Sequence, residues 1–260
     1  MTYLEMNFRS HALNMNVPVT VILPEVGTTG PVGGAPEGTY KTLYLLHGLC
    51  GNHTDWSRKT SIERYASDHG IAVVMPAVAR SWYTDTVYGA NYFTFVTQEL
   101  PHVCRSYFKG MSDRREDNMI GGLSMGGYGA IKAALTYPEQ YSACVILSSA
   151  LDITRKGRNY SLPEWQSIFD YEMKDALELE GSCHDVYALA KKNAAEKKPF
   201  PKLYMWCGTE DTLITPNREF HGLLEQLGVP HCYEESTGTH NWKYWDPMIQ
   251  RGLQNIFEQK

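Results

Sequence analysis

The segment Gly122-Leu123-Ser124-Met125-Gly126 places a single hydroxyl between two glycines, in the pattern G-x-S-x-G. The apolar run "NMIGGLS" leads into it, and the helix-like run "MGGYGAIKAALTYP" follows the serine. A serine on such a sharp strand-to-helix turn is held in a strained backbone conformation, and the flanking glycines leave room for the turn. The pattern therefore predicts that Ser124 is a nucleophile.

A serine hydroxyl needs a base to become nucleophilic, and the base needs a carboxylate to orient it. For a nucleophile on this type of turn, the chain order is serine, then the acid, then histidine. We choose His240 as the base, because "STGTHNW" is a polar loop between the predicted last strand and last helix. The other histidines after Ser124 suit the role less: His184 beside an insertion, His221 inside a helical pattern and His231 within a strand.

The acid is expected in the loop after "KLYMWCG", a predicted strand at 202–208. That loop begins "TEDTLITP" and offers Glu210 and Asp211. We select Asp211, which lies beyond the strand end, and expect Glu210 to be a solvated neighbour or a helix-capping charge. Asp152, after the preceding strand, is the alternative acid.

Two backbone N–H groups are expected to bind the oxyanion of an acyl-transfer intermediate. One belongs to Met125, directly after the nucleophile. The other belongs to Leu49 in "LYLLHGLCGNHTDW", where Gly48 lets the backbone turn. His47 precedes the serine in the chain, so we expect it to brace this loop through a hydrogen bond.

Short apolar runs alternate with helical patterns along most of the chain, which indicates one mostly parallel sheet with helices on both faces. We expect one domain over residues 1–260. The predicted strands are 3–11 and 17–24, which are antiparallel, and 41–49, 71–78, 118–124, 141–151, 202–208 and 229–237.

Three segments depart from the simple alternation of strands and helices. Residues 92–108 form a long predicted helix in which Pro101 should produce a kink or a new first turn. Residues 27–38 are rich in Gly and Pro and are expected to form a surface loop. Residues 152–182 exceed the usual connection of about 2–6 residues. They indicate an insertion over the C-terminal edge of the sheet, where such folds bind ligands.

The composition excludes several classes of protein. Of 260 residues, 43% are hydrophobic and 20% charged, and no run of Lys or Arg accompanies the net charge of −5. These values are typical of a globular protein that does not bind nucleic acid. No signal peptide and no apolar run of about 18 residues is evident. The six cysteines are scattered without metal-like spacing, so we expect a cytoplasmic protein with free thiols and no metal; a homo-oligomer is left open.

Several segments resemble one family of known proteins. They are "LYLLHGLCGNHTDW", "VVMPAVARSWYTDTVYG", "ELPHVCRSYF", "GGLSMGGYGA", "GTEDTL" and "GTHNWKYW". These segments are similar to the esterase D group of α/β-hydrolases, which includes S-formylglutathione hydrolases and mycolyl-type acyltransferases, and most of all to its bacterial tributyrin-esterase branch. The resemblance implies an α/β-hydrolase fold, a triad of Ser124, Asp211 and His240, and oxyanion donors at Leu49 and Met125.

Aromatic residues gather near the expected site. Trp82 and Tyr83 follow a predicted strand and are candidates for the wall of an acyl or sugar pocket, with packing in the core as the alternative. Trp242 and Trp245 are expected to anchor the last helix.

Taken with the resemblance, these residues predict a serine carboxylesterase that cleaves short-chain acyl esters, without a metal or an organic cofactor. The resemblance also implies acetylated sugars and plant cell-wall esters as substrates. The first alternative is S-formylglutathione hydrolysis, although few basic groups beyond Arg80 and Arg155 are available for an anionic thioester. Acyl transfer to a sugar or lipid, and a hydrolase-fold binding protein without catalysis, are the others.

Overall fold

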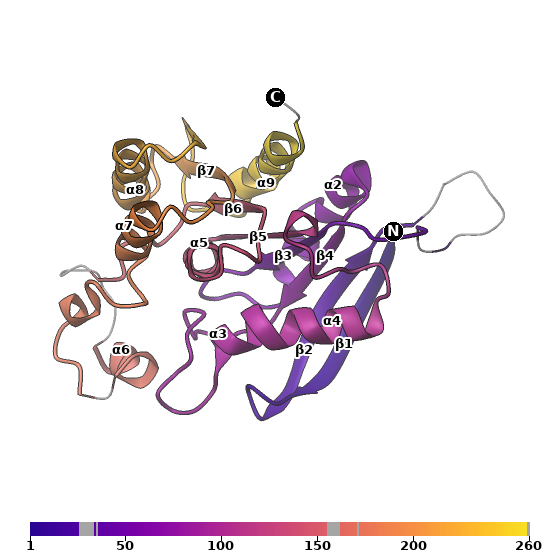
Figure 1. Ribbon diagram of the computed structural model, residues 1–260, viewed down its shortest axis with the longest axis horizontal. Helices are drawn as coiled ribbons and strands as arrows, with labels where there is room; N and C mark the ends of the chain where they lie inside the picture. Colours follow the sequence, from indigo (N-terminus) through magenta and orange to yellow (C-terminus); the bar gives the residue numbers. More distant parts are fainter. Residues whose placement is uncertain (26–33, 35, 155–161, 171, 259–260) are drawn as a thin grey trace.

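A computed structural model of the protein describes residues 1–25, 34, 36–154, 162–170 and 172–258 (Figure 1). Within these residues, eight strands form one sheet in the order β1-β2-β4-β3-β5-β6-β7-β8. The strands are β1 (Thr2–Ser10), β2 (Met15–Leu23), β3 (Thr42–Leu46), β4 (Ala72–Pro76), β5 (Asn118–Leu123), β6 (Ala143–Leu147), β7 (Lys202–Gly208) and β8 (His231–Ser236).

The sheet is antiparallel at one edge and parallel elsewhere. Strand β2 pairs antiparallel with β1 and with β4, whereas β4, β3, β5, β6, β7 and β8 run parallel to one another. The expected antiparallel pair at the start of the chain is therefore confirmed. In parallel strands the carboxyl ends meet at one edge, so the loops after β3, β5, β7 and β8 come together there.

Helices cover both faces of the sheet, as expected, and the α/β-hydrolase fold is confirmed (Figure 1). Side chains alternate along β3: Leu43 and Leu45 pack with α1, α2 and α9, and Tyr44 and Leu46 pack with the helices on the opposite face. The longer helices are α1 (Asp55–Lys59), α2 (Ile62–His69), α4 (Leu100–Tyr107), α5 (Met125–Thr136), α6 (Leu162–Ile168), α7 (Val186–Ala195), α8 (Ile214–Gln226) and α9 (Trp242–Phe257).

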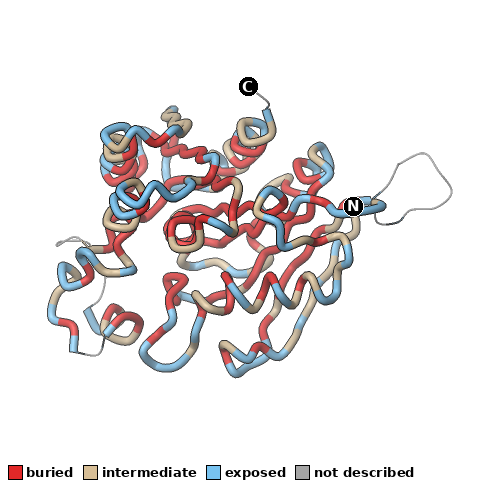
Figure 2. The backbone as a smooth tube through the Cα atoms, viewed as in Figure 1, coloured by how far each residue is buried: buried red, intermediate tan, exposed pale blue. Residues whose placement is uncertain are grey.

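Burial follows this layering. The central strands and α5 are buried along their length, whereas the outer helices are exposed on one side (Figure 2). Helix α5 follows Ser124 directly, so the predicted nucleophile is attached to one of the most enclosed elements. None of the described helices combines the length and the apolar character needed to span a bilayer.

The predicted helix at 92–108 contains a local irregularity around Pro101. It consists of α3 (Tyr92–Thr94), a π-helical turn η1 (Phe95–Glu99), and α4, which has Pro101 in its first turn. Because proline lacks an N–H, the Thr97 carbonyl cannot accept the usual helical hydrogen bond. Instead Gln140 Nε2 donates to the Thr97 carbonyl at 2.8 Å. The expected new first turn at Pro101 is confirmed.

The predicted insertion at 152–182 is described except for 155–161 and 171. Helix α6 packs on the segment that follows β4: the Trp165 and Trp82 rings meet edge-on at 5.0 Å. The Val87 N–H also donates to the Ile168 carbonyl at 3.2 Å. Residues 26–33 and 35, most of the predicted 27–38 loop, lie outside the described residues.

Candidate active site

Ser124 occupies the turn between β5 and α5 in a conformation that most residues avoid. Its φ and ψ are 54° and −120°, and a non-glycine residue held in such a region costs on the order of 1–3 kcal/mol. The turn is fixed by its neighbours, because the Ser124 N–H donates to the Leu147 carbonyl at 3.0 Å and the Ala150 N–H donates to the Ser124 carbonyl at 3.1 Å. The Ser124 backbone is therefore anchored to the end of β6.

The glycines of the G-x-S-x-G pattern are required by close backbone approach. A Cβ at Gly126 would overlap the Leu46 carbonyl oxygen and lie 2.6 Å from that of His47. A Cβ at Gly122 would lie 2.5 Å from the Gly126 carbonyl. Both contacts involve backbone atoms, which cannot rotate away as a side chain can. The predicted strained turn is present, and its two glycines pack against strand β3.

The structure brings together the three residues chosen as the triad. His240 Nε2 lies 3.0 Å from Ser124 Oγ. His240 Nδ1 lies 2.9 Å and 3.1 Å from the two carboxylate oxygens of Asp211. A carboxylate only accepts hydrogen bonds, so Nδ1 carries the proton and the Nε2 lone pair faces the serine hydroxyl. This arrangement can move the Ser124 proton to His240.

The environment of Asp211 keeps its carboxyl group ionised. Its side chain is fully buried, and burial by itself would raise the pKa. Hydrogen bonds from His240, from the Leu213 N–H at 2.8 Å and from the Ser148 hydroxyl outweigh burial, so the pKa lies below its usual value. Asp211 can therefore remain an anion while His240 becomes positively charged.

The neighbouring carboxylate, Glu210, holds the loop that carries His240. The Gly238 N–H donates to Glu210 Oε2 at 2.6 Å, and the Glu210 N–H donates to the Gly238 carbonyl at 3.1 Å. Glu210 is exposed, as predicted, but it also links the loops after β7 and β8. The sequence contained no signal for this second role.

Leu49 lies in the loop after β3, and Met125 is the first residue of α5, directly after Ser124. Among the described residues, neither backbone N–H has an acceptor within the protein. Both are therefore available to a ligand, as an oxyanion site requires. Their role in catalysis remains a prediction.

His47 braces the loop, as predicted. The Val78 N–H donates to His47 Nε2 at 3.1 Å, so Nδ1 carries the proton and donates to the Gly48 carbonyl at 2.7 Å. Burial lowers the pKa of His47, which keeps the ring neutral. Both nitrogens are occupied, and His47 is not available as a base.

The other candidate residues have different partners. His221 Nδ1 and His231 Nε2 lie 2.7 Å apart, and His184 Nδ1 lies 3.2 Å from the Lys132 ammonium. Asp152 is buried after β6. One ring nitrogen of His240 contacts Ser124 and the other contacts Asp211. The structure therefore favours Asp211 over Asp152 as the acid.

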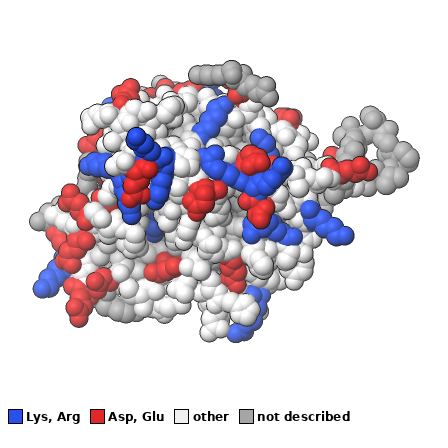
Figure 3. All heavy atoms as spheres, viewed as in Figure 1, with Lys and Arg blue, Asp and Glu red and all other residues white. Residues whose placement is uncertain are grey.

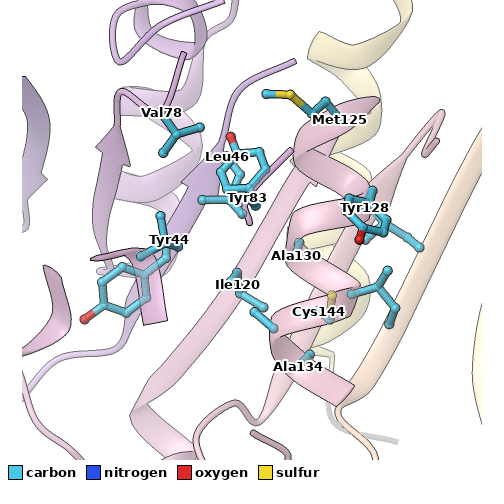
Figure 4. Packing of buried hydrophobic residues seen from close by; sticks show 14 of the residues in the cluster. Tyr44, Leu46, Val78, Tyr83, Ile120, Met125, Tyr128, Ala130, Ala134 and Cys144 are labelled. Carbon is cyan, nitrogen blue, oxygen red and sulfur yellow. The ribbon is translucent and has the colours of Figure 1, made fainter. Parts of the chain in front are cut away.

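Trp82 and Tyr83 do not form the wall of the pocket at Ser124, as one of the two expectations had it. They are 2% and 1% exposed, and neither is among the described residues that line the pocket at Ser124. Both have positive φ values, 52° and 48°. The Tyr83 ring lies in the core beside α5 (Figure 4), and the Trp82 ring packs edge-on against Tyr128 of α5 at 5.9 Å. The alternative of packing in the core accounts for both rings.

The pocket at Ser124 has a volume of about 330 Å³. Its described lining comprises residues 48–51, Asp55, Lys59, Leu123, Ser124, His240, Trp242 and Trp245. Trp242 and Trp245 do anchor α9, because the Trp242 ring packs edge-on against Trp56 at 5.1 Å and Trp245 Nε1 donates to Ser148 Oγ at 3.0 Å. They also form part of the pocket. Asp55 and Lys59 were not candidates in the sequence.

The described residues contain no cluster of three or more His, Cys, Asp or Glu side chains able to hold a metal ion. All six cysteines are free thiols.

Comparison with known proteins finds relatives that cover almost the whole chain. The model of the family described as "Putative esterase" matches residues 10–256. An acetyl esterase of Caldicellulosiruptor saccharolyticus is 35% identical over 264 residues, covering 99% of this chain and 97% of the relative.

Two solved structures from Staphylococcus aureus are similar over 99% of both chains, each at 34% identity. One is FphF, a fluorophosphonate-binding serine hydrolase with bound substrate, at a TM-score of 0.86. The other is FrmB, an S-formylglutathione hydrolase, at a TM-score of 0.84.

Proposed function

Since the chain belongs to this esterase family, we propose that it is a serine carboxylesterase that cleaves short-chain acyl esters through an acyl-enzyme on Ser124. The observation that carries this proposal is the 3.0 Å contact between Ser124 Oγ and His240 Nε2, with Asp211 hydrogen-bonded to the other ring nitrogen. The pocket volume of about 330 Å³ is at the low end for ligand sites, which supports a short acyl group.

In the first half-reaction, Ser124 Oγ attacks the ester carbonyl carbon while His240 Nε2 takes the hydroxyl proton. The negative charge on the carbonyl oxygen is stabilised by the Leu49 and Met125 N–H groups, each worth about 2.7–4 kcal/mol. His240 then donates its proton to the alcohol oxygen, the C–O bond breaks, and the acyl group remains on Ser124. Asp211 stays ionised and stabilises the imidazolium.

In the second half-reaction, water takes the place of the alcohol. His240 removes a proton from the water, which attacks the acyl carbon and forms a second oxyanion at the same two N–H groups. The proton then passes to Ser124 Oγ as the acid leaves. The cycle returns every group to its starting state and uses no further reagent.

The decisive experiment uses Ser124→Ala with p-nitrophenyl acetate. We expect at least a 10³-fold loss of kcat, and mass spectrometry of the wild type after rapid mixing should find an acetyl group on Ser124. Near-normal turnover by Ser124→Ala would contradict the proposal. So would an acetyl adduct on another residue.

S-formylglutathione hydrolysis is the second candidate, supported by the similarity to FrmB. Of the two basic residues expected to favour it, Arg80 is paired with Glu164 at 2.8 Å, and Arg155 lies outside the described residues. Because Arg80 is paired with Glu164 and is not among the described residues that line the pocket at Ser124, we prefer ester hydrolysis. The ratio of kcat/KM for S-formylglutathione to that for p-nitrophenyl acetate distinguishes the two, and added acceptor alcohols test acyl transfer.

The distribution of surface charges supports a small-molecule substrate, and the free cysteines support a cytoplasmic location. On the face shown in Figure 3, Lys and Arg alternate with Asp and Glu, unlike the continuous basic patch that nucleic acid requires. Six free cysteines are typical of a reducing compartment.

A further inference from the structure

The pocket at Ser124 has a polar end that the cleavage chemistry does not use. Asp55 and Lys59, one turn apart on α1, both line it. The Lys59 ammonium lies 3.1 Å from Asp55 Oδ1 and 5.0 Å from the centre of the Trp242 ring. An ion pair therefore faces the same pocket as the apolar side chains of Leu49, Leu123 and the two tryptophans.

Both members of the pair retain hydrogen-bonding capacity. An ammonium has three donors, and among the described residues Asp55 is the one hydrogen-bonding or ionic partner of Lys59, whose side chain is 41% exposed. Asp55 Oδ2 accepts from no donor within the described residues. It lies against Gly51, where a Cβ would overlap it, and the Asp55 side chain, which lines the pocket, is 11% exposed.

The charges of the pair select the kind of ligand. Because Asp55 neutralises Lys59, an anionic ligand would meet a carboxylate as well as an ammonium. A hydroxyl group both donates and accepts, so it can bind to Lys59 Nζ and Asp55 Oδ2 without leaving a buried charge unpaired. Neutral groups that carry hydroxyls therefore fit this end of the pocket.

The position of the pair indicates which half of the ester it meets. His240 must reach the alcohol oxygen to protonate it, so the leaving group lies on the His240 side of Ser124. The His240 and Trp245 rings are in contact at 4.8 Å, Trp245 contacts Trp242 at 5.3 Å, and Lys59 lies over Trp242. This series of contacts leads from the proton donor to the ion pair.

We propose that Asp55 and Lys59 form a subsite for a hydroxyl-bearing leaving group, so that esters of polyols are preferred over esters of simple alkyl alcohols. This inference rests on the proposed esterase function and adds the chemical class of the alcohol. The hydroxyls bind to the ion pair, and the carbon skeleton packs on Trp242.

Two acetate esters isolate the effect of the hydroxyls. Glyceryl 1-acetate and propyl acetate share the acetyl group and the three-carbon chain, and they differ by two hydroxyls. We expect kcat/KM of the wild type to be about tenfold higher for the glycerol ester, as one hydrogen bond to a charged group would produce.

Variants of the pair should remove this preference. Lys59→Met keeps the apolar stem over Trp242 but loses the donors, and Asp55→Asn keeps the shape but loses the charge. Each should bring the ratio of kcat/KM for the two esters close to one, and Lys59→Arg should retain part of it. A partly folded variant lowers both rates equally, so the ratio is insensitive to folding yield.

Lys243→Met is the matched control, because Lys243 also lies over an aromatic ring, 5.4 Å from that of Tyr244, but does not line the pocket. It should keep the wild-type ratio. A wild-type ratio near one, or an unchanged ratio in Lys59→Met and Asp55→Asn, would overturn the subsite and leave the esterase function intact. If the wild type cleaves neither these esters nor p-nitrophenyl acetate, the proposed function itself fails.

Discussion

The Tyr83 hydroxyl donates a hydrogen bond to the His47 carbonyl oxygen at 2.9 Å, within the buried core. Its ring lies against Gly129 of α5, where a Cβ would overlap the ring. One side chain thus contacts both the helix that follows Ser124 and the loop that carries Leu49. The two N–H groups proposed to bind the oxyanion belong to these same two elements, so Tyr83 fixes their separation.

Tyr83→Phe should slow the reaction without weakening substrate binding. Losing the hydroxyl leaves the His47 carbonyl unpaired and frees the Leu49 loop, so we expect kcat to fall about tenfold. The oxyanion forms only in the transition state, so KM should change little. Steady-state kinetics with p-nitrophenyl acetate measure both constants.

Tyr128→Phe is the control for this variant. Its hydroxyl is also buried and donates to a backbone carbonyl, that of His184, at 3.0 Å. Both variants should lose about 1 kcal/mol of stability, whereas Tyr128→Phe should keep its kcat. Equal values of kcat in the two variants would show that Tyr83 has only a structural role.

Gly126→Ala should damage both the fold and the activity. The added methyl group would meet the carbonyl oxygens of Leu46 and His47, which belong to the end of a central strand and to the loop that carries Leu49. We expect a loss of about 1–3 kcal/mol in the free energy of unfolding and about a 10²-fold lower kcat/KM.

Gly222→Ala provides the comparison, because Gly222 lies inside α8 with nothing within 4 Å of an added Cβ. It should stabilise the protein by about 0.5–1 kcal/mol and leave the kinetics unchanged. Urea unfolding and p-nitrophenyl acetate assays test both variants. A Gly126→Ala enzyme as stable and active as the wild type would show that the turn can adapt.

Asp211→Asn and Asp152→Asn separate the two candidate acids. An amide at 211 would no longer stabilise the charged imidazole and would favour the wrong tautomer of His240, so kcat should fall about 10³–10⁴-fold. Asp152→Asn should have a much smaller effect. The reverse order of effects in the same ester assay would assign the acid to Asp152.

The triad could be predicted from the sequence because of the topology of the sheet. Ser124, Asp211 and His240 each follow a strand of the parallel part of the sheet, and parallel strands place their carboxyl ends at one edge. Their order in the chain and their loop positions are therefore sufficient to bring them together. The alternation of strands and helices indicates the fold class for the same reason.

The rest of the site depends on contacts that no local pattern predicts. Trp82 and Tyr83 also follow a parallel strand, but their positive φ values turn both rings into the core. Lys59 and Trp242 are far apart in the sequence and meet only because α1 and α9 pack on the same face of the sheet. The spacing of residues in the sequence does not predict such a contact between two helices.

The pH dependence of stability should report on Lys132, a buried residue of α5. Its side-chain nitrogen Nζ lies 3.2 Å from the Tyr83 carbonyl, 3.0 Å from Thr84 Oγ1 and 3.2 Å from His184 Nδ1. Burial lowers the pKa of Lys132 to about 7, although Cys183 and Asp85 favour its charged form. Burial and the lysine charge lower the pKa of His184 to about 3.

Between pH 7 and about 10.4, the pKa of an unfolded lysine, the unfolded chain holds a proton on Lys132 that the folded chain lacks. Stability rises with pH wherever the unfolded state binds more protons. Relative to Lys132→Met, the free energy of unfolding of the wild type should therefore increase from pH 7 to pH 10, by roughly 1 kcal/mol per pH unit. Urea denaturation at several pH values measures this difference, and the exposed Lys243→Met should track the wild type. Parallel curves for the wild type and Lys132→Met would mean that Lys132 stays charged in the core.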